Sequence, residues 1–381
     1  MAKLLPVPAL YWGKGAFETW ANEQGAPPPG PVLVVHGAGG LDRYPAFAGY
    51  LQGQSAGPVY TRAMAYEPTD RDLDQWLAEL RPKGITQVLA IGGGSVIDAA
   101  KAMASLLSVT GPSRGYLEGV GDRPAPATRL SFTVFPTTGG TGSEATNNAV
   151  ISGEVPGKGH FKKSLRHFCL VPDVSVLEPE FMTGVPRAVS AASGMDALSQ
   201  LMESHFSTQA TDLSRRWTGL GLEHVARGLA RVVEDPTDED GRTSMALAAF
   251  CSGIGLANAG LGLVHGIAGT LGATIPIPHG VACARLYGPV FSRFFRDLQA
   301  ADHPQLPEAR RIAGLFLGRS VESLDEWINW TSGLPDRLEI PRAQNYGWKP
   351  EMIEPMVTKA QNRNSPLPLE PAEIAQILSE I

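Results

Sequence analysis

The chain has 381 residues, of which 43% are apolar and 18% are charged, enough to bury one large core or two moderate ones. Its formal net charge is −6, and no long run of like charges gathers either sign. This composition excludes a peptide module or a disordered linker protein, and it lacks the basic stripe of a nucleic-acid-binding surface. We therefore expect a globular protein with no nucleic-acid partner.

Three cysteines, Cys169, Cys251 and Cys283, lie far apart and form no CxxC spacing, which predicts neither a disulfide framework nor a thiolate zinc site. Such cysteine usage is typical of a reducing compartment, so we expect a cytoplasmic protein. Pro6 and Pro8 interrupt the apolar stretch near the start, and no long apolar run is free of charge, Gly and Pro. We expect neither a signal peptide nor a membrane partner.

The first half of the chain alternates apolar runs with a helical pattern. The runs at 32–35 and 88–91 end in glycine-rich segments, as buried parallel strands often do. Between them, large apolar residues recur at three- and four-residue steps over 69–80, which predicts a helix. A third predicted strand, 130–135, leads into a second Gly- and Thr-rich segment, 136–143. Strand, helix and strand in this order predict a parallel βαβ sheet.

Helical patterns replace the β-branched runs after about residue 180. They cover 188–205, 211–233, 242–271 and 307–318. We therefore predict two domains: an α/β domain over 1–180 with a parallel sheet, followed by an all-α domain over 181–381.

A glycine triplet, Gly92, Gly93 and Gly94, stands where the second strand passes into a helix. Glycines there let backbone N–H groups approach a phosphate, and the helix N-terminus adds partial positive charge, so a dinucleotide pyrophosphate would fit. The spacing is neither GxGxxG nor GxxxxGK[ST], and close packing alone explains an isolated triplet equally well. The second turn favours the ligand interpretation, because turns after separate strands can converge at the carboxyl edge of a sheet.

A metal-ligand pattern lies in the helical half. Asp196 and Gln200 are four residues apart and share a helix face, while His265 and His279 lie beside glycines. Oxygen donors and two imidazoles suit Fe²⁺ or Zn²⁺. Histidines beside glycine are also common as capping or core residues, so the residue types alone leave both interpretations open.

Four segments in this order carry a resemblance to a known family. They are GGGSVIDAAK at 92–101, PTTGGTGSE at 136–144, GMDAL at 194–198 and PHG at 278–280. Together they resemble the iron-containing (group III) alcohol dehydrogenases, which have a dehydroquinate synthase-like fold, over nearly the whole chain. The resemblance implies an N-terminal dinucleotide-binding α/β domain, an all-α C-terminal domain, a homodimer, NAD(P) and a divalent metal, Fe²⁺ or Zn²⁺.

The same resemblance assigns the cofactor-binding residues. In the two turns these are Gly93, Gly94, Ser95, Asp98, Thr137, Thr138 and Thr141. Lys162 matches a lysine kept near the cofactor, although a solvated Lys162–Lys163 pair is the alternative. Gly37 stands where NAD-preferring members carry an Asp that binds the adenosine ribose. Loss of that carboxylate removes a repulsion against a 2′-phosphate, so we expect NADP to be used as well.

The family's metal ligands are one Asp and three His. Asp196, His265 and His279 match them, whereas Gln200 takes the place of the remaining His. An amide oxygen is a poorer donor than imidazole for Fe²⁺ or Zn²⁺, which weakens the expected site. Gly269 stands where many members carry another histidine suited to proton relay, so proton exchange would use water or another group.

The implied reaction is hydride transfer between NAD(P) and a small alcohol or aldehyde, with the metal polarising the substrate oxygen. Without a metal, His265, His279 or Lys162 would supply that stabilisation, as in the related metal-free maleylacetate reductases. The segment 139–144 favours the alcohol dehydrogenase branch over dehydroquinate synthase and glycerol-phosphate dehydrogenase relatives. A nucleotide-binding sensor without catalysis is the remaining alternative.

Overall fold

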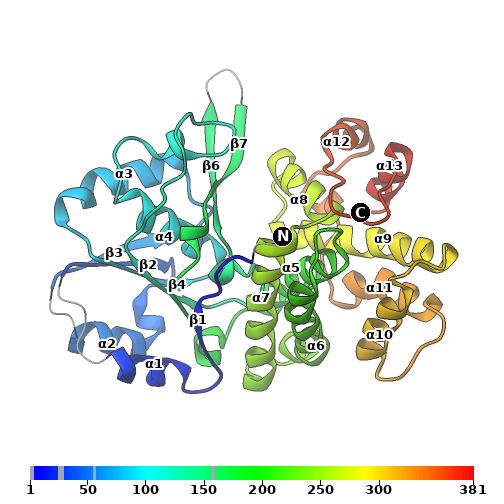
Figure 1. Ribbon diagram of the computed structural model, residues 1–381, viewed down its shortest axis with the longest axis horizontal. Coiled ribbons are helices and arrows are strands. Elements are labelled where there is room, and N and C mark those ends of the chain that lie inside the picture. Colours follow the sequence, from blue (N-terminus) through cyan, green and yellow to red (C-terminus); the bar gives the residue numbers. More distant parts are fainter. Residues whose placement is uncertain (1–3, 25–29, 55–56, 156–158) are drawn as a thin grey trace. The chain divides into compact units, whose positions relative to one another are not determined.

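A computed structural model describes residues 4–24, 30–54, 57–155 and 159–381. These residues divide into two compact units, one ending at Thr183 and the other running from Gly184 to Ile381. The strands of the described residues belong to the first unit, and the second is helical (Figure 1). This confirms the predicted fold class, a parallel α/β part followed by an all-α part.

The first unit is built on a six-stranded parallel sheet with the order β1-β8-β5-β4-β2-β3. The strands are β1 Ala9–Trp12, β2 Val32–Gly37, β3 Val59–Met64, β4 Gln87–Gly92, β5 Ser131–Pro136 and β8 Val174–Leu177. The three strands predicted from apolar runs are β2, β4 and β5, which lie side by side in the middle of the sheet. Their carboxyl ends therefore meet at one edge.

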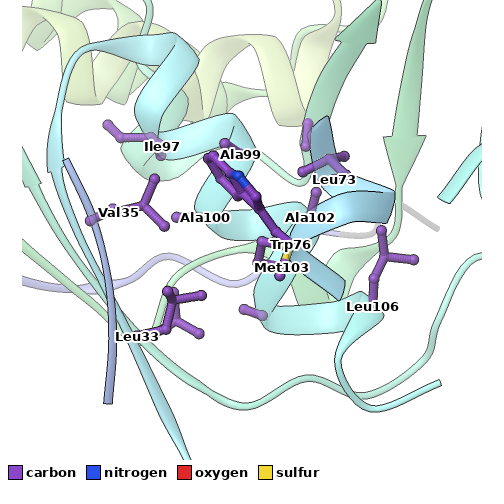
Figure 2. Packing of buried hydrophobic residues seen from close by; sticks show 14 of the residues in the cluster. Leu33, Val35, Leu73, Trp76, Ile97, Ala99, Ala100, Ala102, Met103 and Leu106 are labelled. Carbon is purple, nitrogen blue, oxygen red and sulfur yellow. The ribbon is translucent and has the colours of Figure 1, made fainter. Parts of the chain in front are cut away.

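Helices cover both faces of this sheet: α1 Ala16–Gln24, α2 Pro45–Gln54, α3 Asp70–Leu80 and α4 Gly94–Leu106. Alternate strand residues point to opposite faces, so Leu33 and Val35 of β2 pack with α3 and α4. Val32 and Val34 pack with the aromatic residues of α1 and α2. Figure 2 shows the first of these clusters, in which Trp76 of α3 packs with residues of α4 such as Ala99 and Met103.

The predicted helix over 69–80 is confirmed, with Thr69 as its cap. The Thr69 hydroxyl accepts a hydrogen bond from the Asp72 amide at 3.1 Å, and the Asp72 carboxylate accepts one from the Thr69 amide at 3.1 Å. An antiparallel hairpin of β6 Asn148–Val155 and β7 Gly159–Arg166 follows the second Gly-rich turn. The sequence did not predict this hairpin, because the glycines of the two strands and the lysines of β7 interrupt the alternation of apolar and polar residues that marks a strand.

The second unit is a bundle of helices. They are α5 Arg187–Phe206, α6 Asp212–Glu234, α7 Glu239–Ala259, α8 Leu263–Thr274, α9 His279–Ala300, α10 Leu306–Leu317, α11 Asp325–Arg337, α12 Ile353–Lys359 and α13 Pro371–Ser379. The predicted patterns at 188–205, 211–233 and 307–318 correspond to α5, α6 and α10.

The continuous helical pattern predicted over 242–271 is wrong, because α7 and α8 are separate helices that meet at 100°. Gly260 has φ +68°, a conformation that favours glycine and ends α7. A new helix then starts at Leu263, two residues before His265. Within the described residues no single helix is long and apolar enough to cross a membrane, and only this bent pair passes that test together.

Candidate active site

The two Gly-rich turns of the first unit lie against each other at the carboxyl edge of the sheet. Gly92 of β4 is in register with Pro136 of β5, and the Thr137 amide donates to the Gly92 carbonyl at 3.0 Å. A Cβ on Gly94 would lie only 2.8 Å from the Thr141 side chain. The turns therefore converge as expected, and glycine at 94 is what allows this approach.

Helix α4 opens at this point with its N-terminus towards the turn. Its cap residue, Gly93, has no side chain to accept a hydrogen bond from the first amides of the helix. A Cβ on Gly93 would lie 3.3 Å from the Thr138 hydroxyl, so the second turn packs closely against this end of the helix. Free amides at a helix N-terminus suit a phosphate group. The proposed contacts of Gly93, Gly94, Ser95 and the three threonines with a cofactor remain predictions.

Asp98, another predicted cofactor residue, uses both carboxylate oxygens within the protein. Oδ1 accepts a hydrogen bond from the Ser143 hydroxyl, and Oδ2 accepts one from the Val150 amide at 3.0 Å. Burial raises the pKa of Asp98, while the charge of Lys101 opposes that rise. Asp98 therefore ties α4 to the second turn and to β6, whether or not it also touches a cofactor.

Lys101 closes the first motif and is a buried anchoring residue that the sequence did not predict. Its ammonium is fully buried and donates to Ser143 Oγ at 3.2 Å, Thr146 Oγ1 at 2.6 Å and the Asn148 carbonyl at 3.0 Å. Burial lowers its pKa to about 8, while Asp98 and Glu144 act in the opposite direction. Lys101 anchors the second turn on α4, a role that residue type alone does not reveal because lysines are mostly exposed.

Lys162 and Gly37 lie on strands of the same unit. Lys162 of β7 forms an ion pair with Glu67, and its charge opposes the rise in the pKa of Asp98, so it is not a merely solvated lysine. Gly37 ends β2, next to β4 in the sheet, and no atom lies within 4 Å of a Cβ built on it. A side chain at position 37 would therefore meet open space.

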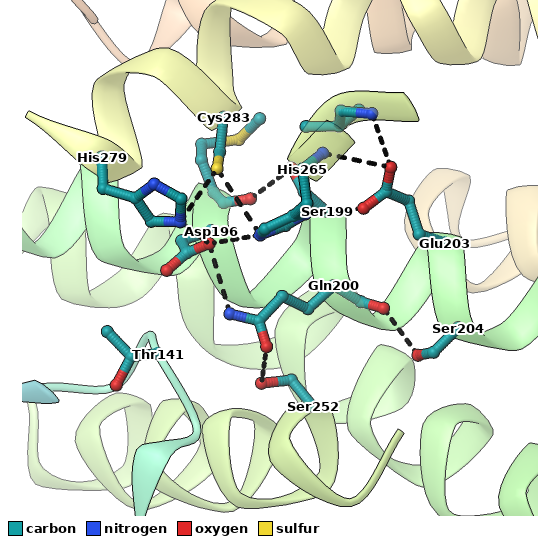
Figure 3. A network of polar contacts seen from close by, with 12 residues as sticks. Thr141, Asp196, Ser199, Gln200, Glu203, Ser204, Ser252, His265, His279 and Cys283 are labelled. Atoms are coloured by element: carbon teal, nitrogen blue, oxygen red, sulfur yellow. Dashed lines mark hydrogen bonds and ion pairs between the residues drawn. The ribbon is translucent and has the colours of Figure 1, made fainter. Parts of the chain in front are cut away.

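In the helical unit, four potential ligands from three helices come together (Figure 3). Asp196 lies on α5, His265 on α8, and His279 and Cys283 on α9, and one ligand atom of each lies within 4.8 Å of the others. His265 Nε2 is 3.0 Å and His279 Nε2 3.7 Å from Asp196 Oδ1. The structure thus joins three of the four predicted metal residues and adds Cys283.

Gln200, the fourth predicted metal residue, contacts this cluster through its nitrogen. Gln200 Nε2 donates to Asp196 Oδ1 at 3.3 Å, and the Gln200 oxygen lies 3.4 Å from Ser252 Oγ (Figure 3). An amide nitrogen is a hydrogen-bond donor and not a metal ligand. Gln200 therefore supports the Asp196 carboxylate in this arrangement.

Glu203 holds His265 in place and was also missed. Its Oε2 accepts a hydrogen bond from His265 Nδ1 at 2.6 Å, and its Oε1 accepts one from the Val264 amide at 2.6 Å. One carboxylate thus caps α8 and turns His265 Nε2 towards Asp196. The only sequence signal is its position on α5, two helical turns after Asp196.

The electrostatics of the cluster follow from this arrangement. Burial acts to raise the pKa of Asp196, but the charges of His279 and His265 and the hydrogen bond from His265 hold it well below its usual range. Burial acts to lower the pKa of His265, yet Cys283, Glu203 and Asp196 raise it well above its usual value. The charge of Cys283 raises the pKa of His279. A cation that binds here must displace protons from the imidazoles.

Comparisons with known proteins agree with this architecture. The sequence model of iron-containing alcohol dehydrogenase matches residues 8–179, and that of the Fe-containing alcohol dehydrogenase family, C-terminal, matches 190–381. The chain is 37% identical over 304 residues to the probable alcohol dehydrogenase EutG of Escherichia coli, covering 79% of this chain and 75% of that protein.

Solved structures share the fold. A 1,3-propanediol oxidoreductase superposes with a TM-score of 0.83 at 26% identity, covering 100% of this chain and 99% of the other. A sulfoacetaldehyde reductase from Bifidobacterium kashiwanohense, solved in complex with NAD⁺, also has a TM-score of 0.83, at 23% identity, covering 100% of this chain and 98% of that one.

Proposed function

Because the chain belongs to the iron-containing alcohol dehydrogenase family and is therefore an oxidoreductase acting on CH–OH groups, we propose that it is an NAD(P)-dependent alcohol dehydrogenase or aldehyde reductase that works with a divalent cation. Its substrates would be small alcohols or aldehydes. The observation that carries the cation part of this proposal is the convergence of Asp196, His265 and His279.

The donor set fits such a cation. A carboxylate oxygen and two imidazole nitrogens suit Fe²⁺ or Zn²⁺, and Asp196, His265 and His279 would hold it. When bound, the cation would polarise the substrate oxygen and NAD(P) would exchange the hydride. Glu203 keeps His265 in the orientation that presents Nε2, so His265 needs little reorganisation on binding.

The first unit would hold the cofactor mainly through backbone. The amides that open α4 at Gly94 and Ser95 would face the pyrophosphate, as helix N-termini do in other nucleotide-binding proteins. Lys101 and Asp98 fix the neighbouring turn against α4 from the buried side. That rigidity preserves the close approach of Thr141 to Gly94.

The open space beside Gly37 supports use of NADPH as well as NADH. Position 37 carries no carboxylate that would bind the ribose hydroxyls or repel a 2′-phosphate. Lys162 is positively charged and is proposed as a further cofactor contact. It would leave its ion pair with Glu67 to contact the cofactor.

A metal-free reductase, resembling the maleylacetate reductases, is the second candidate. Gln200 favours it, because its nitrogen faces Asp196 where the resemblance expects an imidazole. In that case His279, whose pKa is raised, would act as a positively charged hydrogen-bond donor to the substrate oxygen, and His265, whose pKa is also raised, would add its positive charge from nearby.

The remaining expectations concern the setting of the reaction. We propose a homodimer that acts in the cytoplasm on a small molecule, with neither nucleic acid nor a membrane as partner. The net charge of −6 and the absence of a concentrated basic run support the exclusion of nucleic acid.

The test is turnover before and after chelation. Protein purified without chelator is assayed with NADPH and NADH against a panel of aldehydes, then stripped and reloaded with Zn²⁺ or Fe²⁺. We expect chelation to remove the activity and one of these cations to restore it. Full activity in the stripped protein would favour the metal-free reductase, and no turnover with either cofactor would overturn the proposal.

A further inference from the structure

We propose that Cys283 is the fourth ligand of the cation, in the place that the resemblance gives to Gln200, and that the resulting site prefers Zn²⁺ to Fe²⁺. This inference rests on the proposed cation site and specifies its chemistry. It gives a role to a buried thiol that lies on the same face of α9 as His279, one turn further along.

The distances around Cys283 are those of a shared cation. Its Sγ lies 3.6 Å from His265 Nε2 and 3.6 Å from His279 Nε2. With a Zn–S distance of about 2.3 Å and a Zn–N distance of about 2.0–2.1 Å, tetrahedral geometry also separates sulfur and nitrogen by about 3.6 Å. Both imidazoles are thus placed as neighbours of the sulfur on one coordination polyhedron.

A hydrogen bond explains only part of this geometry. A thiol donates one proton and its sulfur accepts only weakly, so hydrogen bonds alone would hold Cys283 weakly between two imidazoles at equal distance. The nitrogens of His265 are already directed at Glu203 and Asp196. A cation between Asp196, His265, His279 and Cys283 would account for the convergence of four potential ligand atoms within 4.8 Å of one another.

Gln200 presents its amide nitrogen, a hydrogen-bond donor, to the cluster. Its nitrogen points at Asp196 and its oxygen at Ser252, away from the carboxylate. In this orientation Gln200 donates to a ligand carboxylate, as the outer partners of metal sites commonly do. A thiolate from α9 therefore takes the role of the imidazole that the resemblance expects at position 200.

Charge and softness favour zinc in such a set. Asp196 and a Cys283 thiolate together carry two negative charges, which match a divalent ion in a buried site. Thiolate is a soft ligand that selects Zn²⁺. Zinc can also expand from four to five ligands, so a fourth protein ligand leaves room for a substrate.

The experiment titrates Co²⁺, a spectroscopic substitute for Zn²⁺, into metal-free protein under reducing conditions without cofactor or substrate. Wild type is compared with Cys283→Ser, Gln200→Ala, Asp196→Ala and the control Cys251→Ser, which alters another buried thiol outside the cluster. Circular dichroism checks that each variant is folded. We expect a thiolate-to-cobalt charge-transfer band in wild type, Gln200→Ala and Cys251→Ser, and none in Cys283→Ser.

Affinity gives a second readout. Cys283→Ser should weaken Co²⁺ and Zn²⁺ binding by more than the roughly 10–100-fold that loss of an outer partner costs, and it should lower the ratio of Zn²⁺ to Fe²⁺ retained in anaerobic competition. Wild type that binds one Co²⁺ per chain without the band, or a band that survives in Cys283→Ser, would overturn the inference. If either result is found but Asp196→Ala loses the cation, only the role of Cys283 is overturned and the proposed function stands. Wild type that binds no cation would overturn both.

Discussion

The two units build their candidate sites in different ways. In the α/β unit the cofactor turns are backbone, contributed by two short continuous segments, 92–101 and 136–144, at neighbouring strand ends. In the helical unit the cation cluster is made of single side chains from α5, α8 and α9. The first kind of site depends on glycine and chain direction, whereas the second depends on each side chain and on the partners that orient it.

This difference predicts that substitutions in the cluster lower the activity more than substitutions in the turns do. Asp196→Ala should cause the largest loss. Polarisation of a substrate oxygen supplies several kcal/mol and each 1.36 kcal/mol is a factor of ten, so kcat should fall by about 10³-fold. The control Asp212→Ala removes an exposed carboxylate from α6 and should leave kcat unchanged. Steady-state kinetics measure both, and more than a tenth of wild-type activity in Asp196→Ala would contradict the comparison.

Lys101→Met tests whether one buried side chain is as important in the α/β unit. Loss of the buried ammonium and its three hydrogen bonds should cost about 3–5 kcal/mol of unfolding free energy, because Asp98 and Glu144 also lose a nearby positive charge. The folded pKa, about 8, lies below the ordinary 10.5, so the unfolded chain binds more protons between these values. The stability of wild type relative to the variant should therefore rise with pH in that window.

Urea unfolding at the two ends of the window measures this effect. Lys163→Met, an exposed position on β7, is the control and should change stability by no more than about 0.5 kcal/mol. Coincident unfolding curves for wild type and Lys101→Met would show that the second turn does not need its buried anchor.

Glu203→Gln tests the orienting role found in the helical unit. The amide cannot accept with both atoms from Val264 and His265, so cation affinity should fall by roughly 10–100-fold while the fold persists. Calorimetric titration with Zn²⁺ measures this affinity, and Glu223→Gln on α6 is the control variant. Equal affinities in Glu203→Gln and wild type would mean that α8 alone positions His265.

Gly94→Ala tests the backbone site. The new methyl would meet Thr141 at 2.8 Å, and overpacking of this kind costs about 1–3 kcal/mol, so the Kd for NADPH should rise about tenfold or more. Gly49→Ala on α2, where a Cβ meets nothing within 4 Å, is the matched control. Unchanged fluorescence titrations of NADPH in Gly94→Ala would place the cofactor elsewhere.

Gly37→Asp should have the smallest effect, because it adds a charge in open space without moving the turns. Two like charges a few ångströms apart near a protein surface repel by about 1–4 kcal/mol, so the kcat/KM ratio of NADPH to NADH should fall about tenfold. Gly37→Asn, of equal size but uncharged, separates charge from bulk. If both variants shift the ratio equally, position 37 acts by shape.

The sequence predicts the α/β unit better than the helical one for a physical reason. Local patterns such as the apolar run at 32–35 and the helical periodicity over 69–80 are complete within short segments, and β2 and α3 form where they indicate. The helical break at Gly260 was missed because the apolar pattern runs on across it, although α7 ends there. Its consequence is that His265 stands at the start of a new helix.

The cluster was predicted only in part, because its members are distant in the chain. Residue type and spacing indicate Asp196, His265 and His279 as possible ligands, the family resemblance favours that interpretation, and the structure brings them together. Cys283 was dismissed on its spacing to other cysteines, whereas its partners in space are histidines. Glu203 gives no periodic signal that distinguishes it from a surface carboxylate, yet it is buried against His265.

The most direct test of the central claim is the metal content of the protein as purified, compared with that of Asp196→Ala. If Asp196, His265 and His279 hold a working cation, elemental analysis finds about one divalent ion per wild-type chain and essentially none in the variant. Wild type that contains no divalent ion and keeps full alcohol oxidation after exhaustive chelation would contradict this claim and leave the metal-free reductase in its place.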